Sequence, residues 1–311
     1  MKFAHVPVLS KEVIEYLVPK SNENFIDCTI GGGGHAKEIL KRTNPNGKLL
    51  GIDQDPVAIS AAKENLKEFS KKITLITDNF KNLKEIIYDT GFNKIDGILL
   101  DLGISSYELQ DVSRGFSFKG SAFLDMRFGQ EGLTAADVLN NYKETDLIRI
   151  FKDYGEERYA RQIAEEIVKQ RKISKIIKTD QLVAIIENVY KNKPKPRKIH
   201  IATRVFQALR IEVNDELNNL KKVLPVILSL LNKGGRLAII SFHSLEDRIV
   251  KQFLKREAKE CLCPPYLPVC QCGHHAQLKI LTKKVITPSL AEIKANPKSR
   301  SAKLRAAVKI I

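Results

Sequence analysis

The chain has 311 residues, of which 43% are apolar and 28% are charged, and lysine and arginine outnumber aspartate and glutamate by 52 to 36. This length and composition exclude a disordered, fibrous or small disulfide-stapled protein, because a chain of this size can bury about three quarters of its unfolded surface. The formal net charge of +16 favours a polyanionic partner such as nucleic acid.

The amino-terminal segment lacks the pattern of a signal peptide, since single charges are scattered among its apolar residues. Nowhere do about eighteen apolar residues follow one another without a charge, which is the length that a membrane span requires. We therefore expect a soluble, cytoplasmic protein that has no membrane contact.

Apolar runs rich in isoleucine and leucine alternate with helical patterns as far as Gly103, which is typical of a parallel α/β sheet. The predicted strands are residues 24–30, 48–53, 73–77, 95–103 and, much later, 235–242. A helix is predicted after each of the first three strands, over residues 35–43, 56–69 and 80–90. Pro56 and Gly91 are the residue types that helix starts and helix ends prefer.

A long stretch separates the fourth predicted strand from the fifth, although a crossover connection needs only a few tens of residues. Apolar residues recur at helical spacing within it, over residues 134–142, 157–171 and 179–190. We therefore predict a mostly helical subdomain at residues 105–200, inserted into an α/β domain made of residues 1–104 and 201–311.

The first motif with chemical meaning is Asp27–Ala36, DCTIGGGGHA, where a predicted strand enters a glycine-rich turn and then a helix. Glycines let the backbone approach a ligand, and a helix N-terminus favours a negatively charged group. Asp53, at the end of the next predicted strand, is suited to accept hydrogen bonds from ribose hydroxyls. These signals indicate a nucleoside but leave NAD and S-adenosylmethionine open, because the spacing also fits Gly-x-Gly-x-x-Ala.

Two further candidates follow later strands. Asp101, in DLGISS, comes at the carboxyl end of the fourth predicted strand, where open α/β sheets place their reactive groups. The alternative for Asp101 is a capping role, since Asp, Gly and Ser are common in turns. His243 follows the fifth strand, and its sequence context is equally compatible with proton transfer and with a structural role.

These motifs and several others, taken together and in order, resemble the MraW family of bacterial ribosomal small-subunit RNA methyltransferases. The resemblance covers nearly the whole chain and rests on DCTIGGGGH, GIDQDP, IDGILLDLGISS, RGFSF, LDMR, YGEER, ATRVFQALRI and SFHSLEDRIVK. It implies a Rossmann-like fold and S-adenosylmethionine-dependent methylation of the exocyclic N4 of one cytidine in the decoding region of 16S rRNA. The implied partners are 16S rRNA and the small ribosomal subunit, and the oligomeric state stays open.

The resemblance also implies cofactor contacts at Gly33, Gly34, His35, Asp53, Phe80, Asp101 and Glu108. His35 and the glycines would lie near the methionine end, Asp53 on the ribose and Phe80 against the adenine. Asp101 would lie near the adenine edge or the reaction centre. Glu108 departs from the family, which has Pro-Gln where this chain has Tyr-Glu, and an ionised glutamate cannot donate a hydrogen bond as glutamine does.

The implied reaction needs help from the protein, because the lone pair of a cytosine amine is delocalised into the ring. Hydrogen-bond acceptors must draw the nitrogen toward tetrahedral geometry, and we expect Asp101 and the backbone of residues 102–105 to do so. His243 is expected to accept the proton or to bind the base. Two other functions stay open, a nicotinamide-dependent oxidoreductase and a noncatalytic RNA-binding assembly factor.

Two basic segments are candidates for RNA contacts. Eleven cations accompany two acids from Lys169 to Arg204, and thirteen accompany three from Lys251 onward. We expect the inserted subdomain to recognise the RNA substrate through the first of them. Phe116, Phe118 and Phe123 would either stack on a flipped base or pack in a core.

Four of the five cysteines lie close together, at Cys261, Cys263, Cys270 and Cys272. A disulfide framework is not expected in a protein without an export signal. Four thiolates are suited to zinc, but Cys-x-Cys spacing is tighter than the usual Cys-x-x-Cys. We therefore expect reduced thiols and no metal, with structural zinc as the alternative.

Overall fold

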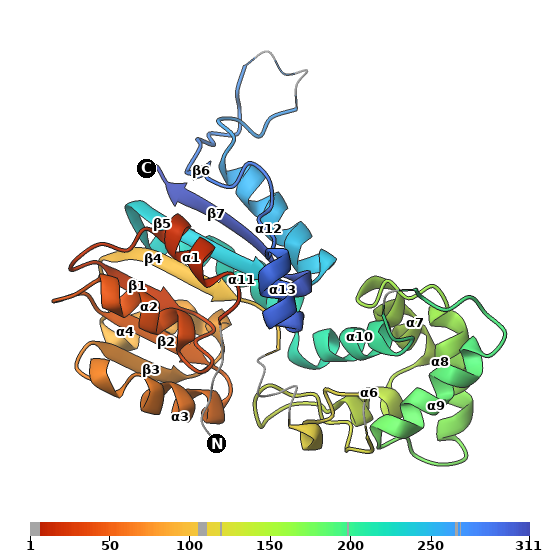
Figure 1. Ribbon diagram of the computed structural model, residues 1–311. Helices are drawn as coiled ribbons and strands as arrows, with labels where there is room; N and C mark the ends of the chain where they lie inside the picture. Colours follow the sequence, from red (N-terminus) through yellow and green to blue (C-terminus); the bar gives the residue numbers. More distant parts are fainter. Residues whose placement is uncertain (1–6, 105–110, 119, 198, 265–266, 268) are drawn as a thin grey trace. The chain divides into compact units, whose positions relative to one another are not determined.

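The computed structural model describes residues 7–104, 111–118, 120–197, 199–264, 267 and 269–311. The chain divides into two compact units, one formed by Met1–Gly103 with Leu217–Ile311 and the other by Ile104–Glu216 (Figure 1). The second unit continues past residue 200, because helix α10 (Thr203–Asn214) buries its apolar side chains in the core of that unit. The predicted end of the insert is therefore corrected from residue 200 to Glu216.

The first unit contains a seven-stranded sheet with the order β3-β2-β1-β4-β5-β7-β6 among the described residues. Strands β1 to β5 pair in parallel, and β7 pairs antiparallel with both β5 and β6. The strands are β1 Asn24–Asp27, β2 Leu49–Asp53, β3 Ile73–Thr77, β4 Ile95–Asp101, β5 Leu231–Ser241, β6 Leu278–Ile280 and β7 Lys303–Lys309. This arrangement confirms the predicted Rossmann-like fold, and its order reverses between β1 and β4, where such sheets bind ligands.

Helices cover both faces of the sheet, because its strands bury side chains on both sides. Phe25 and Leu99 pack with α1 and α2 in one apolar cluster, and Ile26 and Leu100 pack with α4, α11 and α12 in another. The helices are α1 Ser10–Leu17, α2 Gly34–Arg42, α3 Pro56–Asn65, α4 Leu83–Thr90, α11 Glu216–Leu230, α12 Ser244–Glu257 and α13 Leu290–Ala295. None of the described helices is both long enough and apolar enough to cross a membrane.

Several elements differ from their predicted bounds. Strand β3 has the predicted bounds, but β1 ends at Asp27 and not at residue 30, because the chain turns immediately after Asp27. Strand β5 begins at Leu231, before the predicted start at residue 235. Strands β6 and β7 were not predicted, since lysine and arginine interrupt the apolar pattern of β7 and β6 has only 3 residues.

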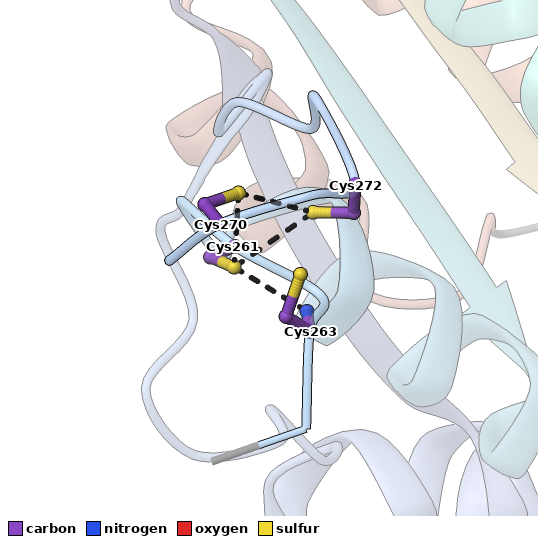
Figure 2. A group of neighbouring side chains, drawn as sticks. All are labelled: Cys261, Cys263, Cys270 and Cys272. Carbon is purple, nitrogen blue, oxygen red and sulfur yellow. Dashed lines mark hydrogen bonds between the residues drawn. The ribbon is translucent and has the colours of Figure 1, made fainter. Parts of the chain in front are cut away.

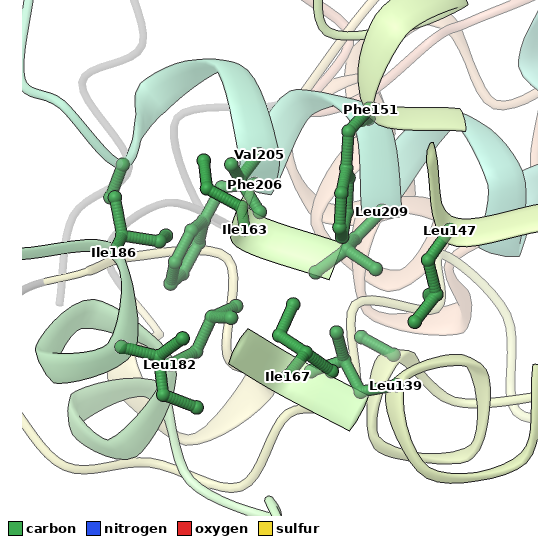
Figure 3. Packing of buried hydrophobic residues seen from close by; sticks show 14 of the residues in the cluster. Leu139, Leu147, Phe151, Ile163, Ile167, Leu182, Ile186, Val205, Phe206 and Leu209 are labelled. Carbon is green, nitrogen blue, oxygen red and sulfur yellow. The ribbon is translucent and has the colours of Figure 1, made fainter. Parts of the chain in front are cut away.

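The second unit is helical and has a hydrophobic core of its own, which Figure 3 shows. Its helices are α6 Ala135–Asn141, α7 Glu144–Asp153, α8 Ala160–Arg171, α9 Thr179–Tyr190 and α10. Leu139, Phe151, Ile163 and Leu209 come from four of these helices and are all fully buried. Helix α7 was not predicted, although it buries one apolar side as the other helices do.

Candidate active site

The glycine-rich turn predicted within Asp27–Ala36 joins the carboxyl end of β1 to helix α2, which begins at Gly34. Gly33 is the N-cap residue of α2 and has a φ of 81°. A Cβ atom at Gly33 would lie 2.7 Å from Cδ1 of Leu66, so glycine is required by both conformation and space. No side chain of the described residues caps α2, which leaves its N-terminus suited to an anionic ligand group.

Asp53, at the end of β2, is hydrogen-bonded to this turn. Its Oδ2 accepts the backbone N–H of Gly31 at 2.9 Å, and its Oδ1 accepts that of Asp55 at 3.0 Å. Burial raises the pKa of the Asp53 carboxyl to about 6, although the backbone hydrogen bonds oppose this rise. Because a carboxylate has about four acceptor positions, Asp53 has the capacity to accept ligand hydroxyls and still hold the turn.

His35 and Asp101 lie together although they come from α2 and β4. The Nε2 atom of His35 is 3.6 Å from Oδ2 of Asp101, and His35 is only 5% exposed. The backbone N–H of Asp101 donates to the Thr29 hydroxyl at 2.6 Å, which ties the end of β4 to the glycine-rich turn. Both ring nitrogens of His35 and Oδ1 of Asp101 are buried without a hydrogen-bond partner among the described residues. Buried polar atoms of this kind require an explanation, and a ligand that pairs with them is a direct one.

Asp27 belongs to the same group of titratable side chains, although it was not among the predicted site residues. Its side chain is 1% exposed, and burial raises the pKa of its carboxyl to about 7. His35 lowers this pKa, whereas the negative charges of Asp101 and Asp53 raise it. The signal in the sequence was the acid that begins the motif DCTIGGGGHA. The ends of β1, β2 and β4 thus bring three carboxyls and one imidazole together.

Phe80 lies beyond the end of β3, in a 3-10 turn at Phe80–Asn82 that leads into α4. Its ring is partly buried and packs against the apolar cluster that contains α4. The segment is attached to the Asp53 region, because the backbone N–H of Asp78 donates to the carbonyl of Asp53 at 3.0 Å. The Nδ2 atom of Asn79 also donates to Oε1 of Gln54 at 2.8 Å.

His243 caps helix α12. The backbone N–H of Glu246 donates to Nδ1 of His243 at 3.4 Å, and the Glu246 carboxylate accepts from the backbone N–H of His243 at 3.2 Å. Nε2 of His243 is 3.1 Å from Oε1 of Glu246, although Nε2 makes no hydrogen bond among the described residues. The structure therefore shows a structural role for His243 and leaves its predicted chemical role untested.

Glu108 and three phenylalanines are the predicted residues that remain. Glu108 lies outside the described residues, and so does part of the backbone predicted to accept hydrogen bonds. Phe116 is buried and stacks on Phe128 with 5.6 Å between ring centroids, whereas Phe118 stacks on His200 at 4.5 Å. Phe123 is 46% exposed. Core packing therefore accounts for Phe116, and Phe123 has the exposed ring that stacking on a base requires.

A known protein family and several named proteins are similar to this chain over nearly its whole length. A model of the MraW methylase family matches residues 2–310. A protein of Heliobacterium mobile named ribosomal RNA small subunit methyltransferase H is 49% identical over 312 residues, which covers 100% of each chain. A protein of the same name from Clostridium botulinum strain 657 / Type Ba4 is 50% identical over 311 residues, again with 100% of each chain covered.

Among solved structures, an rRNA methylase from Streptococcus thermophilus aligns over 99% of this chain and 100% of its own, with 11% identity and a TM-score of 0.45. The spacing Gly-x-Gly-x-x-Ala left two cofactors open, NAD and S-adenosylmethionine. The family match and the full-length relatives decide between them, because they identify a methylase and not an oxidoreductase. The chain belongs to the MraW methylase family, and its cofactor is S-adenosylmethionine.

Proposed function

We propose that this protein methylates the exocyclic N4 of one cytidine in the decoding region of 16S rRNA. The names of relatives that are 49% and 50% identical over their whole length support a substrate in the small ribosomal subunit. The formal net charge of +16 is consistent with an RNA substrate. A ribosomal substrate places the proposed activity in the cytoplasm.

The residues at the ends of β1, β2 and β4 fit S-adenosylmethionine. Gly33 and Gly34 present the N-terminus of α2 to the methionine carboxylate, and His35 lies beside them. Asp53 accepts the ribose hydroxyls, and Phe80 packs against the adenine. The observation behind this fit is the set of buried, unpaired atoms on His35 and Asp101. The cofactor supplies an electrophilic methyl group on a sulfonium centre.

Asp101 carries the proposed chemistry, because it is at the carboxyl end of β4 and has a carboxyl oxygen without a partner among the described residues. Its carboxylate accepts a hydrogen bond from the cytosine amine, which directs the nitrogen lone pair toward the methyl group. The same negative charge stabilises the positive charge that develops on the nitrogen as the new bond forms. His243 remains a candidate for accepting the released proton or for binding the base.

The insert is proposed to bind the RNA around the target base. Lys195 and Arg197 are exposed in its basic segment, while Lys198 lies outside the described residues. Phe123 is the candidate for stacking on the extruded base, because its ring is 46% exposed. Glu108 remains a proposed cofactor contact.

Methyl transfer from labelled S-adenosylmethionine tests the proposal. Small ribosomal subunits that lack the modification should become labelled, and nucleoside analysis by mass spectrometry should identify N4-methylcytidine. Subunits that already carry the mark serve as the control, and free 16S rRNA shows whether the assembled subunit is required. Label on another nucleoside would refute the N4 assignment. RNA binding without any transfer would favour the noncatalytic assembly factor.

A further inference from the structure

Four cysteine sulfurs converge in the segment between α12 and β6 (Figure 2). The Sγ atoms of Cys261, Cys263, Cys270 and Cys272 all lie within 4.8 Å of one another. Three of the separations are 3.4 Å for Cys261 to Cys270, 3.7 Å for Cys261 to Cys272 and 3.6 Å for Cys270 to Cys272. The two Cys-x-Cys pairs therefore face each other across the loop.

These separations identify the kind of site. A disulfide would bring one pair of sulfurs to about 2 Å, which none of these three separations approaches. Four thiolates around a tetrahedral zinc ion, each about 2.3 Å from the metal, would have sulfurs about 3.8 Å apart. The separations of 3.4–3.7 Å are close to that value.

Backbone N–H groups of the loop point at the sulfurs, as expected where negative charge is concentrated on thiolates. The N–H of Leu262 donates to Cys272, that of Cys263 donates to Cys261, and that of Gln271 donates to Cys263, each at 3.3 Å. Hydrogen bonds to ligand sulfurs are a common part of metal–thiolate sites. They would stabilise the excess negative charge of four thiolates around one divalent cation.

The loop has little else to hold it in place. Residues 258–277 contain no described helix or strand, and Ala276 is the buried apolar side chain among those described. Ordering each residue of a loop costs conformational entropy, which buried apolar surface usually offsets. Because Cys270 and Cys272 are exposed, the convergence of the sulfurs cannot be a by-product of core packing.

We propose that Cys261, Cys263, Cys270 and Cys272 bind one zinc ion in a closed, tetrahedral, structural site. This proposal replaces the expectation of reduced, metal-free thiols, which rested on the tightness of Cys-x-Cys spacing and on a methyl-transfer reaction that requires no such site. Four protein ligands leave no position open for a substrate, so the metal orders the loop and does not take part in methyl transfer. The ordered loop connects α12 to β6 at the edge of the sheet.

Metal analysis of the full-length chain, purified without an affinity tag that binds metal, tests the site. We expect about one zinc ion per chain, as a closed four-cysteine site binds. The double variant Cys270→Ser/Cys272→Ser should contain at least about tenfold less zinc. Cys28→Ala is the matched control, because it removes the one thiol that lies at the glycine-rich turn and should keep full zinc content.

Cobalt replacement supplies a second measurement on the wild-type chain, in case the double variant does not fold. Cobalt(II) bound by four thiolates should give strong visible absorption and a thiolate-to-metal charge-transfer band. Removing zinc with a thiol-modifying reagent should make residues 258–277 sensitive to protease while S-adenosylhomocysteine still binds. A metal-free chain with full protease resistance, two disulfides found by mass spectrometry, or iron in place of zinc would each overturn the proposal.

Discussion

Nε2 of His35 lies 3.6 Å from Oδ2 of Asp101, yet neither ring nitrogen of the histidine makes a hydrogen bond among the described residues. An unpaired polar atom in a buried position costs about 1–3 kcal/mol, so a protein keeps such atoms where something else pairs with them. Asp101 is the last residue of β4, and His35 lies in α2, which follows β1. The strand order of the sheet reverses between β1 and β4. A ligand group that reaches these two residues would meet donor and acceptor atoms that are already in position.

Asp101→Asn should lower turnover by about ten- to a thousandfold, because it keeps the size of the side chain but removes the negative charge. Single-turnover rates at saturating S-adenosylmethionine measure this effect on the chemical step. Asp89→Asn is the control, since it removes the same charge from an exposed position on α4. A wild-type rate for Asp101→Asn at saturating cofactor would leave this residue with a binding role only.

Asp53→Ala should weaken S-adenosylmethionine binding, since ribose hydroxyls would lose a charged acceptor worth about 1.5–3 kcal/mol per hydrogen bond, which is about ten- to a hundredfold in Kd. The variant also frees the N–H of Gly31, so part of the loss comes from the glycine-rich turn. Asp53→Asn keeps an oxygen for Gly31 and should lose less affinity. Titration with S-adenosylhomocysteine measures both, and an unchanged Kd in folded Asp53→Ala would refute the ribose contact.

Asp27 should make the free energy of unfolding depend on pH. Burial raises the pKa of its carboxyl from 3.8 to about 7, so between these values the folded chain keeps a proton that the unfolded chain has lost. The contribution of this group to stability is therefore complete below about pH 4 and falls as the pH rises toward 7.

Asp27→Asn removes this titration and keeps an oxygen for the N–H of Thr29. The substitution should raise the free energy of unfolding more, or lower it less, at pH 8 than at pH 4. The effects at the two pH values should differ by about 2–4 kcal/mol. Urea unfolding of both proteins at the two pH values measures this difference. The same change at both pH values would show that Asp27 does not titrate in this range.

Replacing Lys195, Arg197 and Lys198 by alanine should lower rRNA affinity and leave cofactor affinity intact. The logarithm of the binding constant should also depend less steeply on the logarithm of salt concentration, by about 0.7–0.9 for each lost phosphate contact. Alanine substitution of Lys63, Lys67 and Lys71, which are exposed in the first unit, is the matched control. Equal salt slopes for the two triple variants would mean that the insert cations are ordinary surface charges.

Local sequence was sufficient to predict the existence of the five parallel strands and most of the residues of the candidate site. Strand β3 has its predicted bounds because ITLIT is a short run of β-branched and apolar residues between turns. The glycine-rich turn, Asp53 and Asp101 were identified because each lies at the end of a strand, and parallel strands bring their carboxyl ends to one edge. Strand β7 was not predicted because its charged residues interrupt the apolar pattern. Its antiparallel pairing with β5 is a contact between distant segments, which the local pattern does not show.

The sequence by itself determined the α/β class, the family resemblance and the residue types at the strand ends, because these depend on periodicity and on short motifs. Tertiary structure alone decided that Asp27 is buried beside His35 and Asp101, and that burial is what raises its pKa. It also decided that α10 belongs to the core of the insert and that four cysteine sulfurs meet. The physical reason is the same in each case: burial and contacts between distant segments depend on which elements become neighbours, and local patterns do not contain that information.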